Sequence, residues 1–185
     1  MEKVKAVITG VGGYVPEYIL TNEELARMVD TNDEWITTRV GIKERRILKE
    51  EGLGSSYLAR KAAKQLIQKT GVDPQTIDCV ICATTTSDYR FPSNASIVIG
   101  KLGLTNAHGF DVSCACCGFL YTVDMASTFI ESGRHKRVMV IAAEKMSSIV
   151  DYQDRQTCVL FGDGAAAVML EATTEEGVGF QDSFL

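Results

Sequence analysis

Apolar and polar positions follow two periods along the chain, and these divide it into strands and helices. Short apolar runs rich in β-branched residues predict strands at 4–12, 77–85, 108–113, 137–144 and 161–172. Apolar residues instead recur at the spacing of one helical face between positions 55 and 70, and Gly71 follows as a stop signal. Strands that alternate with helices predict an α/β protein built on a layered sheet.

Three further helices are predicted from their end signals. Thr21 with Glu24 three residues later forms a capping box at the start of 21–30. A second helix opens at Phe91-Pro92-Ser93 and ends at Gly103, and a long one spans 114–132 before Gly133. From 114 to 130 this helix has no Lys or Arg and one acidic residue, Asp124. A helix that is apolar all round is normally buried on every side, so we expect something beyond this chain to cover one face.

Composition excludes several classes of protein. The chain has 185 residues, 45% of them hydrophobic, which is enough for one α/β domain without disulfides. Its six cysteines follow no small-scaffold spacing, and the first residues have no apolar secretory segment, so we expect a reducing cytosol. No apolar run approaches the roughly 20 residues of a membrane span. A net charge of −5 argues against nucleic acid, and we interpret the basic clusters at 43–46 and 134–137 as solvated loop ends.

Metal, redox and dinucleotide sites are weakly supported. Cys79 and Cys82 form a Cys-x-x-Cys pair inside a strand, where an offset of three points the side chains to opposite faces. The cysteines at 114, 116 and 117 have no histidine near them in sequence, so we expect no metal site. The run TGVGGYVP matches only part of the dinucleotide fingerprint, because Pro16 stands where a helix should begin.

The run FDVSCACCGF (110–119) places three cysteines at a join between a strand and a helix. Amides at a helix N-terminus stabilise a thiolate, so a cysteine there is a candidate nucleophile. The alternative is small residues chosen for tight packing, and local sequence leaves both open. A nucleophile also needs a base. The two histidines, His108 and His135, lie before the cluster's strand and after its helix, so neither is well placed.

Four motifs read together resemble a known family: 29–46 (VDTNDEWITTRVGIKERR), 83–96 (ATTTSDYRFPSNAS), 110–119 and 154–167 (DRQTCVLFGDGAAA). In order and spacing they resemble the N-terminal half of β-ketoacyl-acyl carrier protein synthase III, of the thiolase-like superfamily. The resemblance implies one mixed, mostly parallel five-stranded sheet with helices on both faces. It places an N-terminal half-domain at 1–172, and at 173–185 the start of a connection to a C-terminal half outside this chain.

The resemblance also implies a reaction and its nucleophile. The family's cysteine in the C-x-G-F run falls on Cys116; Cys114 and Cys117 stand where the family has small residues, and are interpreted as packing residues. An acyl group, acetyl in our prediction, passes from CoA to the cysteine. It then condenses with malonyl-acyl carrier protein and starts fatty-acid synthesis in the cytoplasm. The resemblance also implies that the reaction needs no cofactor and that the enzyme is a homodimer.

Matched positions further imply the substrate contacts. Trp35 and Arg155 resemble the pair that sandwiches the CoA adenine, with Thr31 nearby and Arg39 reaching a phosphate. An aromatic face and a planar guanidinium both stack on a base. Phe91 resembles the residue that lines the acyl pocket across a dimer interface, although a helix-entry anchor is an equal local interpretation.

The family's catalytic His and Asn, and its glycine-rich oxyanion segment, come from the second half. We therefore expect this chain alone not to complete the condensation. Two alternatives stay open: another thiolase-like enzyme, such as a hydroxymethylglutaryl-CoA synthase or secondary-metabolite ketosynthase, and a non-catalytic half that serves as a structural partner. The sequence fixes neither primer length and branching nor the carrier-protein surface.

Overall fold

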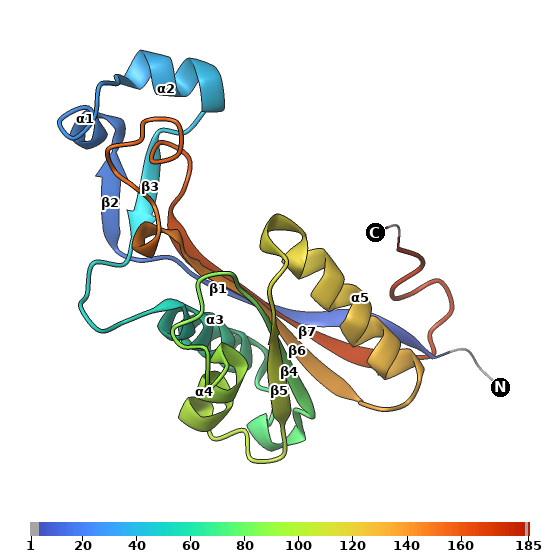
Figure 1. Cartoon of the computed structure of the whole chain (residues 1–185). Coiled ribbons are helices and arrows are strands. Elements are labelled where there is room, and N and C mark those ends of the chain that lie inside the picture. The colour runs from blue at the N-terminus through green and yellow to red at the C-terminus, as the bar shows by residue number, and fades with distance from the viewer. Residues whose placement is uncertain (1–3, 184) are drawn as a thin grey trace.

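The central sheet has five strands in the order β1-β7-β6-β4-β5 in the computed structural model, which describes residues 4–183 and 185 (Figure 1). Strand β4 is parallel to both β5 and β6, whereas β7 is antiparallel to both β6 and β1. Four strands therefore run in one direction, and the predicted mixed, mostly parallel sheet is confirmed. The strands are β1 (Lys5–Tyr14), β4 (Cys79–Ala83), β5 (His108–Val112), β6 (Arg137–Lys145) and β7 (Asp163–Thr173).

Helices cover both faces of this sheet. Helices α3 (Ser55–Thr70) and α4 (Asn94–Leu102) pack on one face, and α5 (Gly118–Glu131) packs on the other. Cys82 belongs to the first core and Cys79 to the second, which confirms that the pair points to opposite faces. Both are buried, as is expected for a central parallel strand. The predicted stops of α3 and α4 are also confirmed, because Gly71 and Gly103 cap them in the left-handed conformation.

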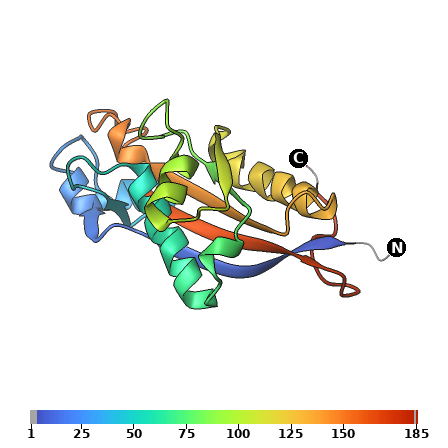
Figure 2. The same cartoon turned by 90° about the horizontal axis from the view of Figure 1, so that it is seen from below.

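The glycines of the first strand serve helix packing. A Cβ on Gly12 would lie 2.4 Å from the carbonyl oxygen of Ala62 and 2.6 Å from the amide nitrogen of Leu66, both in the α3 backbone. Only a residue without a side chain allows this approach of β1 to α3. Figure 2 shows β1 (blue) and β7 (red) running side by side along the sheet, with α3 (teal) beside them.

A second, two-stranded sheet extends from the first and was not predicted. It pairs β2 (Tyr18–Thr21) with β3 (Glu44–Ile47), and α1 (Asn22–Leu25) and α2 (Asp33–Val40) lie beyond it (Figure 1). Thr21 caps α1 as predicted, with its hydroxyl accepting from the Glu24 amide at 3.2 Å, but the helix ends at Leu25. The two-stranded sheet and its helices have a small core of their own, which contains Leu20, Leu25 and Ile36.

One basic residue of the 43–46 cluster contradicts our interpretation of that cluster as a solvated loop end. Arg45 is only 3% exposed, because it lies on β3 and donates to the Val159 carbonyl (Nε, 3.1 Å) and to the Asn22 side chain. Burial lowers the pKa of its guanidinium. Arg45 thus ties the small sheet to the loop before β7.

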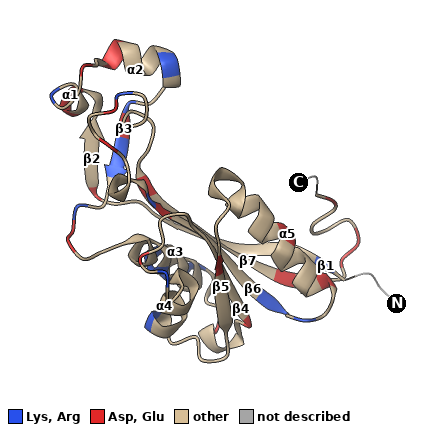
Figure 3. Ribbon diagram, viewed as in Figure 1, with Lys and Arg blue, Asp and Glu red and all other residues tan. Residues whose placement is uncertain are grey.

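Helix α5 is buried on one side only. Val123, Ala126 and Ile130 face the sheet, whereas Leu120 is 58% exposed and Tyr121 lies half-exposed beside it. Figure 3 shows the helix almost free of charge, with red only at its acidic residues. Burial on every side is therefore not found within this chain, and an apolar face stays open.

The remaining elements are 3₁₀ turns at Pro74–Thr76, Ala115–Cys117 and Met146–Ser148. Across the described residues, every helix is too short or too polar to cross a membrane.

Candidate active site

Cys116 lies in the turn between β5 and α5. Its thiol is exposed, as is that of Cys117, while Cys114 is half-buried. We expected the first turn of the helix, but Ala115–Cys117 forms a separate 3₁₀ turn and α5 begins at Gly118. Ala115 has φ of +47°, a left-handed conformation that costs a residue with a Cβ on the order of 1–2 kcal/mol. Such strain is typical of functional turns.

A pocket of about 330 Å³ opens beside this thiol. It lies at the carboxyl ends of β4 and β6 and at the start of β7, the end of an α/β sheet where ligands usually bind. Besides Cys116 itself, its walls are mostly alanine and glycine, so few large side chains fill it. The remaining lining residues are Ala83, Ala115, Phe119, Ala142, Ala143, Glu144, Gly164, Ala165 and Ala166.

Glu144 is the one acidic residue of this pocket, and sequence analysis did not single it out. Its carboxylate accepts hydrogen bonds from the amides of Thr85 (2.7 Å) and Thr86 (3.1 Å) and from the hydroxyls of that threonine run. It therefore fixes the loop after β4 beside the thiol. The signal that could have identified it is an acidic residue directly after the apolar run 138–143 of this strand.

Neither of the chain's two histidines lies near the thiol. His108 begins β5, whose far end leads to Cys116, and the strand's five residues span about 16 Å. His135 contacts His108 at that same distant end, with 4.9 Å between ring centroids. The expectation that neither histidine is placed as a base for this thiol is confirmed.

Trp35 lies on α2, where the Asn32 side chain caps the helix by accepting from the Trp35 amide at 2.7 Å. The guanidinium carbon of Arg39 is 4.7 Å from the centroid of the Trp35 ring, and that of Arg155 is 5.0 Å away. Arg155 donates to the Asp30 carbonyl at 3.1 Å and pairs with its carboxylate at 3.6 Å. The fold thus brings Trp35, Arg39 and Arg155 together from two distant segments.

Two neighbours complete this cluster. Thr31 follows Asp30, and its hydroxyl is buried without a hydrogen-bond partner among the described residues. Asp154 orders the loop that carries Arg155, since its carboxylate accepts from the Gln156 amide (2.9 Å) and the Thr157 hydroxyl (2.7 Å). These bonds, the Gln156 amide first, lower the pKa of Asp154.

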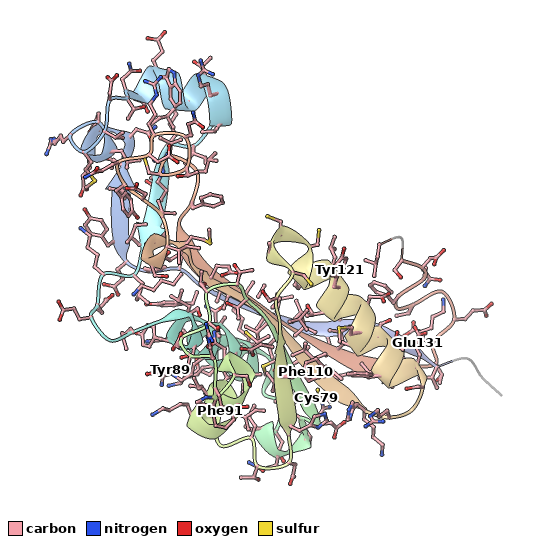
Figure 4. The ribbon with its side chains drawn as sticks, viewed as in Figure 1. Cys79, Tyr89, Phe91, Phe110, Tyr121 and Glu131 are labelled. Carbon is pink, nitrogen blue, oxygen red and sulfur yellow. The ribbon has the colours of Figure 1, made fainter. Side chains whose placement is uncertain are left out.

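Phe91 lies apart from the Cys116 pocket. It is 89% exposed, on the loop before α4, and Figure 4 shows it on the outer surface beside Tyr89. Within this chain it lines no part of that pocket. The helix-entry interpretation is not supported, because an anchor would pack against the helix and the Phe91 side chain does not. Ser93 caps α4 by accepting from the Ser96 amide at 3.1 Å. A larger hollow of about 500 Å³ near Phe91, lined by Arg60, Asp88 and Lys101 among others, contains no cysteine or histidine.

Solved structures define the class. The chain superposes on 3-oxoacyl-[acyl-carrier-protein] synthase III from Aquifex aeolicus with a TM-score of 0.89 and 49% identity, over 92% of this chain and 55% of that one. The priming β-ketosynthase of the R1128 polyketide pathway gives a TM-score of 0.88 at 35% identity, over 92% and 51%. The chain therefore has the thiolase-like fold of the condensing enzymes.

Sequence relatives narrow this class. Residues 110–185 match the family model described as 3-oxoacyl-[acyl-carrier-protein (ACP)] synthase III. The β-ketoacyl-[acyl-carrier-protein] synthase III of Phocaeicola vulgatus is 68% identical, and one from Bacteroides thetaiotaomicron 66%, each across all of this chain. The chain spans about half the length of these curated relatives, 55% in both cases. It corresponds to the N-terminal half of β-ketoacyl-acyl carrier protein synthase III.

Proposed function

We propose that this chain supplies the acyl-accepting thiol and the CoA-binding residues of a condensing enzyme that starts fatty-acid synthesis. The observation that carries the proposal is the position of Cys116, exposed on a strained turn above a pocket of small residues. The Cys116 thiolate attacks the thioester carbonyl of an acyl-CoA, acetyl-CoA in this proposal. The new S–acyl bond forms as the bond between the acyl carbon and the CoA sulfur breaks. CoA leaves as its thiolate and takes up the proton that the Cys116 thiol lost.

The second half-reaction uses the acyl-cysteine as an electrophile. Malonyl-acyl carrier protein loses carbon dioxide, its α-carbon attacks the acyl carbonyl, and the Cys116 thiolate departs with formation of a 3-oxoacyl carrier protein. Two steps through a covalent intermediate are ordinary nucleophilic catalysis. No cofactor takes part, and both substrates are cytosolic.

The cluster around Trp35 is proposed to hold the nucleotide end of CoA. A planar base between Trp35 and Arg155 needs about 7 Å between the two planes, twice a van der Waals contact. The observed 5.0 Å is too short, so Arg155 must swing away as the base enters. Its ion pair with the fully exposed Asp30 side chain opposes this little, because exposed pairs contribute about 0–1 kcal/mol. Arg39 is the proposed phosphate contact. The Thr31 hydroxyl, which has no hydrogen-bond partner within residues 4–183 and 185, is the proposed polar contact.

A second half is proposed to complete the site. The resemblance assigns the catalytic His and Asn to it, and the open apolar face of α5 supports a partner layer there. In this proposal residues 1–172 form the first half-domain, and 173–185 begin the connection. Phe91 is proposed to reach the acyl pocket of a second subunit in a homodimer, since it is exposed and lines no pocket at Cys116 in its own chain.

Acyl transfer to Cys116 is the direct test. The chain is incubated with acetyl-CoA, and intact mass is compared for the unaltered protein and for Cys116→Ser, Cys114→Ser and Cys117→Ser. One acetyl group is expected on every form except Cys116→Ser, and peptide mapping should locate it at position 116. A label that persists in Cys116→Ser, or that disappears in either control, would contradict the assignment. Adding malonyl-acyl carrier protein should give no condensation product from this chain alone.

A second candidate function follows from the likeness to the polyketide priming ketosynthase. There the same thiol would receive a starter acyl group for a secondary metabolite. Competition between fatty-acid and polyketide carrier proteins for the acylated, complete enzyme separates the two.

A further inference from the structure

Three side chains from separate segments meet at the amino ends of the parallel strands. Cys79 begins β4, and His108 is its register partner at the start of β5. His135 lies in the loop between α5 and β6. The Cys79 sulfur and one ring nitrogen from each histidine all lie within 4.8 Å of one another. Figure 4 labels Cys79 at the end of the sheet away from the start of α5, which is where Cys116 lies.

The two histidine rings pack against each other and, at His135, against Phe129. Their centroids are 4.9 Å apart at an angle of 47°, and the edge of Phe129 lies 5.5 Å from His135. The Nε2 atom of His135 is buried and has no hydrogen-bond partner among the described residues. A buried polar atom without a partner destabilises the folded state. A ligand on this nitrogen would remove that destabilisation.

Hydrogen bonds to the Asp78 carboxylate and to two backbone carbonyls hold the backbone around the cluster. Asp78 Oδ2 accepts from the amides of Lys136 (2.6 Å) and Arg137 (2.9 Å), which anchors the loop just after His135. The His108 amide donates to the Asp78 carbonyl at 3.2 Å, and the His135 amide donates to the Phe129 carbonyl at 3.2 Å. The backbone segments that carry the three side chains are therefore held in place before any ligand arrives.

We propose that Cys79, His108 and His135 bind a divalent ion of the zinc type, with water as the fourth ligand. One thiolate and two imidazoles are a donor set suited to zinc and unsuited to magnesium or calcium, which take oxygen ligands. Zinc–sulfur and zinc–nitrogen distances of about 2.3 and 2.0 Å require the donors to be about 3.3–3.6 Å apart. The exposed ring of His108 can make the inward shift.

Protonation states agree with this arrangement. Burial, and next the neighbouring His108, lowers the pKa of His135 and keeps the ring in the neutral form that binds metals. Burial, and next Asp78, raises the pKa of the Cys79 thiol to about 11, so the ion must displace a proton. The S–H bond breaks, an S–metal bond forms, and the proton leaves to solvent. The bound ion would link β4, β5 and the loop before β6, remote from the Cys116 pocket.

Cobalt(II) is the probe for the test, because its spectrum reports both thiolate ligation and tetrahedral geometry. The 185-residue chain is used with Cys114, Cys116 and Cys117 all changed to serine, so that these exposed thiols cannot compete. One Co²⁺ per chain is expected, with a thiolate-to-cobalt charge-transfer band and the strong visible bands of a tetrahedral ion. Loss of one protein ligand should weaken Co²⁺ binding about tenfold or more, because changing a residue that only hydrogen-bonds to a metal ligand already lowers metal affinity by about that factor.

Variants separate this site from incidental binding. His135→Ala and Cys79→Ser should each weaken binding and abolish the tetrahedral spectrum, while Cys82→Ser, equally buried on the other face, should bind like the parent. If Cys79→Ser fails to fold, His108→Ala tests the site at an exposed position. A cobalt spectrum without the charge-transfer band, or equal affinity in His135→Ala, would overturn the proposal. The readout does not depend on acyl transfer, so failure here leaves the proposed function untouched.

Discussion

The guanidinium carbon of Arg155 lies 5.0 Å from the centroid of the Trp35 ring, although the two residues are far apart in the sequence. The loop that carries Arg155 thereby closes over α2 at the position proposed for the CoA base. Trp35 is the chain's single tryptophan, so tryptophan fluorescence reports on this cluster alone.

CoA should quench Trp35 fluorescence as the adenine takes the place of the guanidinium. Arg155→Ala should weaken this binding about fivefold, because one stacking and cation–π partner, worth on the order of 1 kcal/mol, is lost. A fluorescence titration measures both values. Arg60→Ala, which removes a similar arginine 5.3 Å from the Tyr57 ring, is the matched control and should bind CoA normally. Unchanged affinity in Arg155→Ala would count against the proposed sandwich.

The exposed apolar face of α5 should cause the chain to self-associate. Leu120→Glu places a charge on this face and should lower the average mass seen by sedimentation velocity. Ile149→Glu changes an equally exposed apolar residue away from the helix, 64% exposed against 58%, and should have little effect. Equal effects of the two variants would show that general hydrophobicity drives association.

Gly12 should tolerate no side chain. Gly12→Ala places a Cβ at 2.4 Å from the Ala62 carbonyl, and since the obstacle is helix backbone, β1 and α3 must separate. We expect the free energy of unfolding to fall by about 1–3 kcal/mol or more. Gly13→Ala is the control, because the nearest atom to its Cβ would be 3.7 Å away. Urea denaturation of both variants measures the difference, and similar losses in both would refute the packing argument.

Stability should fall as the pH rises above about 9, in the presence of a chelator to exclude metals. The folded-state pKa of Cys79 is raised from 9.0 to about 11, so its contribution is complete below pH 9 and is lost as the pH rises toward 11. Two pKa units correspond to roughly 2–3 kcal/mol as an upper limit. Urea denaturation at pH 8 and 10.5 should show a smaller pH-dependent loss in Cys79→Ala than in the unaltered chain. Parallel losses would contradict the shift.

Local signals in the sequence predicted most elements of the central domain. The spacing of apolar residues in 55–70 and the glycines at 71 and 103 specified α3 and the end of α4, because helix periodicity and left-handed caps are local properties. The small sheet of β2 and β3 was missed, because both strands are four residues long and their core comes from segments that include Cys158 and Val159. A polar strand such as ERRI shows no alternation of apolar and polar residues from which a strand could be predicted. Arg45 is buried only because Val159 and Asn22 accept hydrogen bonds from its guanidinium.

The sequence by itself determined the α/β architecture, the position of a cysteine between a strand and a helix, and four motifs that lead to the synthase III family. Each depends on residue types at short spacing. Only the tertiary structure decided which distant groups meet: Arg155 with Trp35, Glu144 with the loop beside the thiol, and Cys79 with His108 and His135. Strand order and register set those encounters, and both are fixed by long-range pairing that no local pattern encodes.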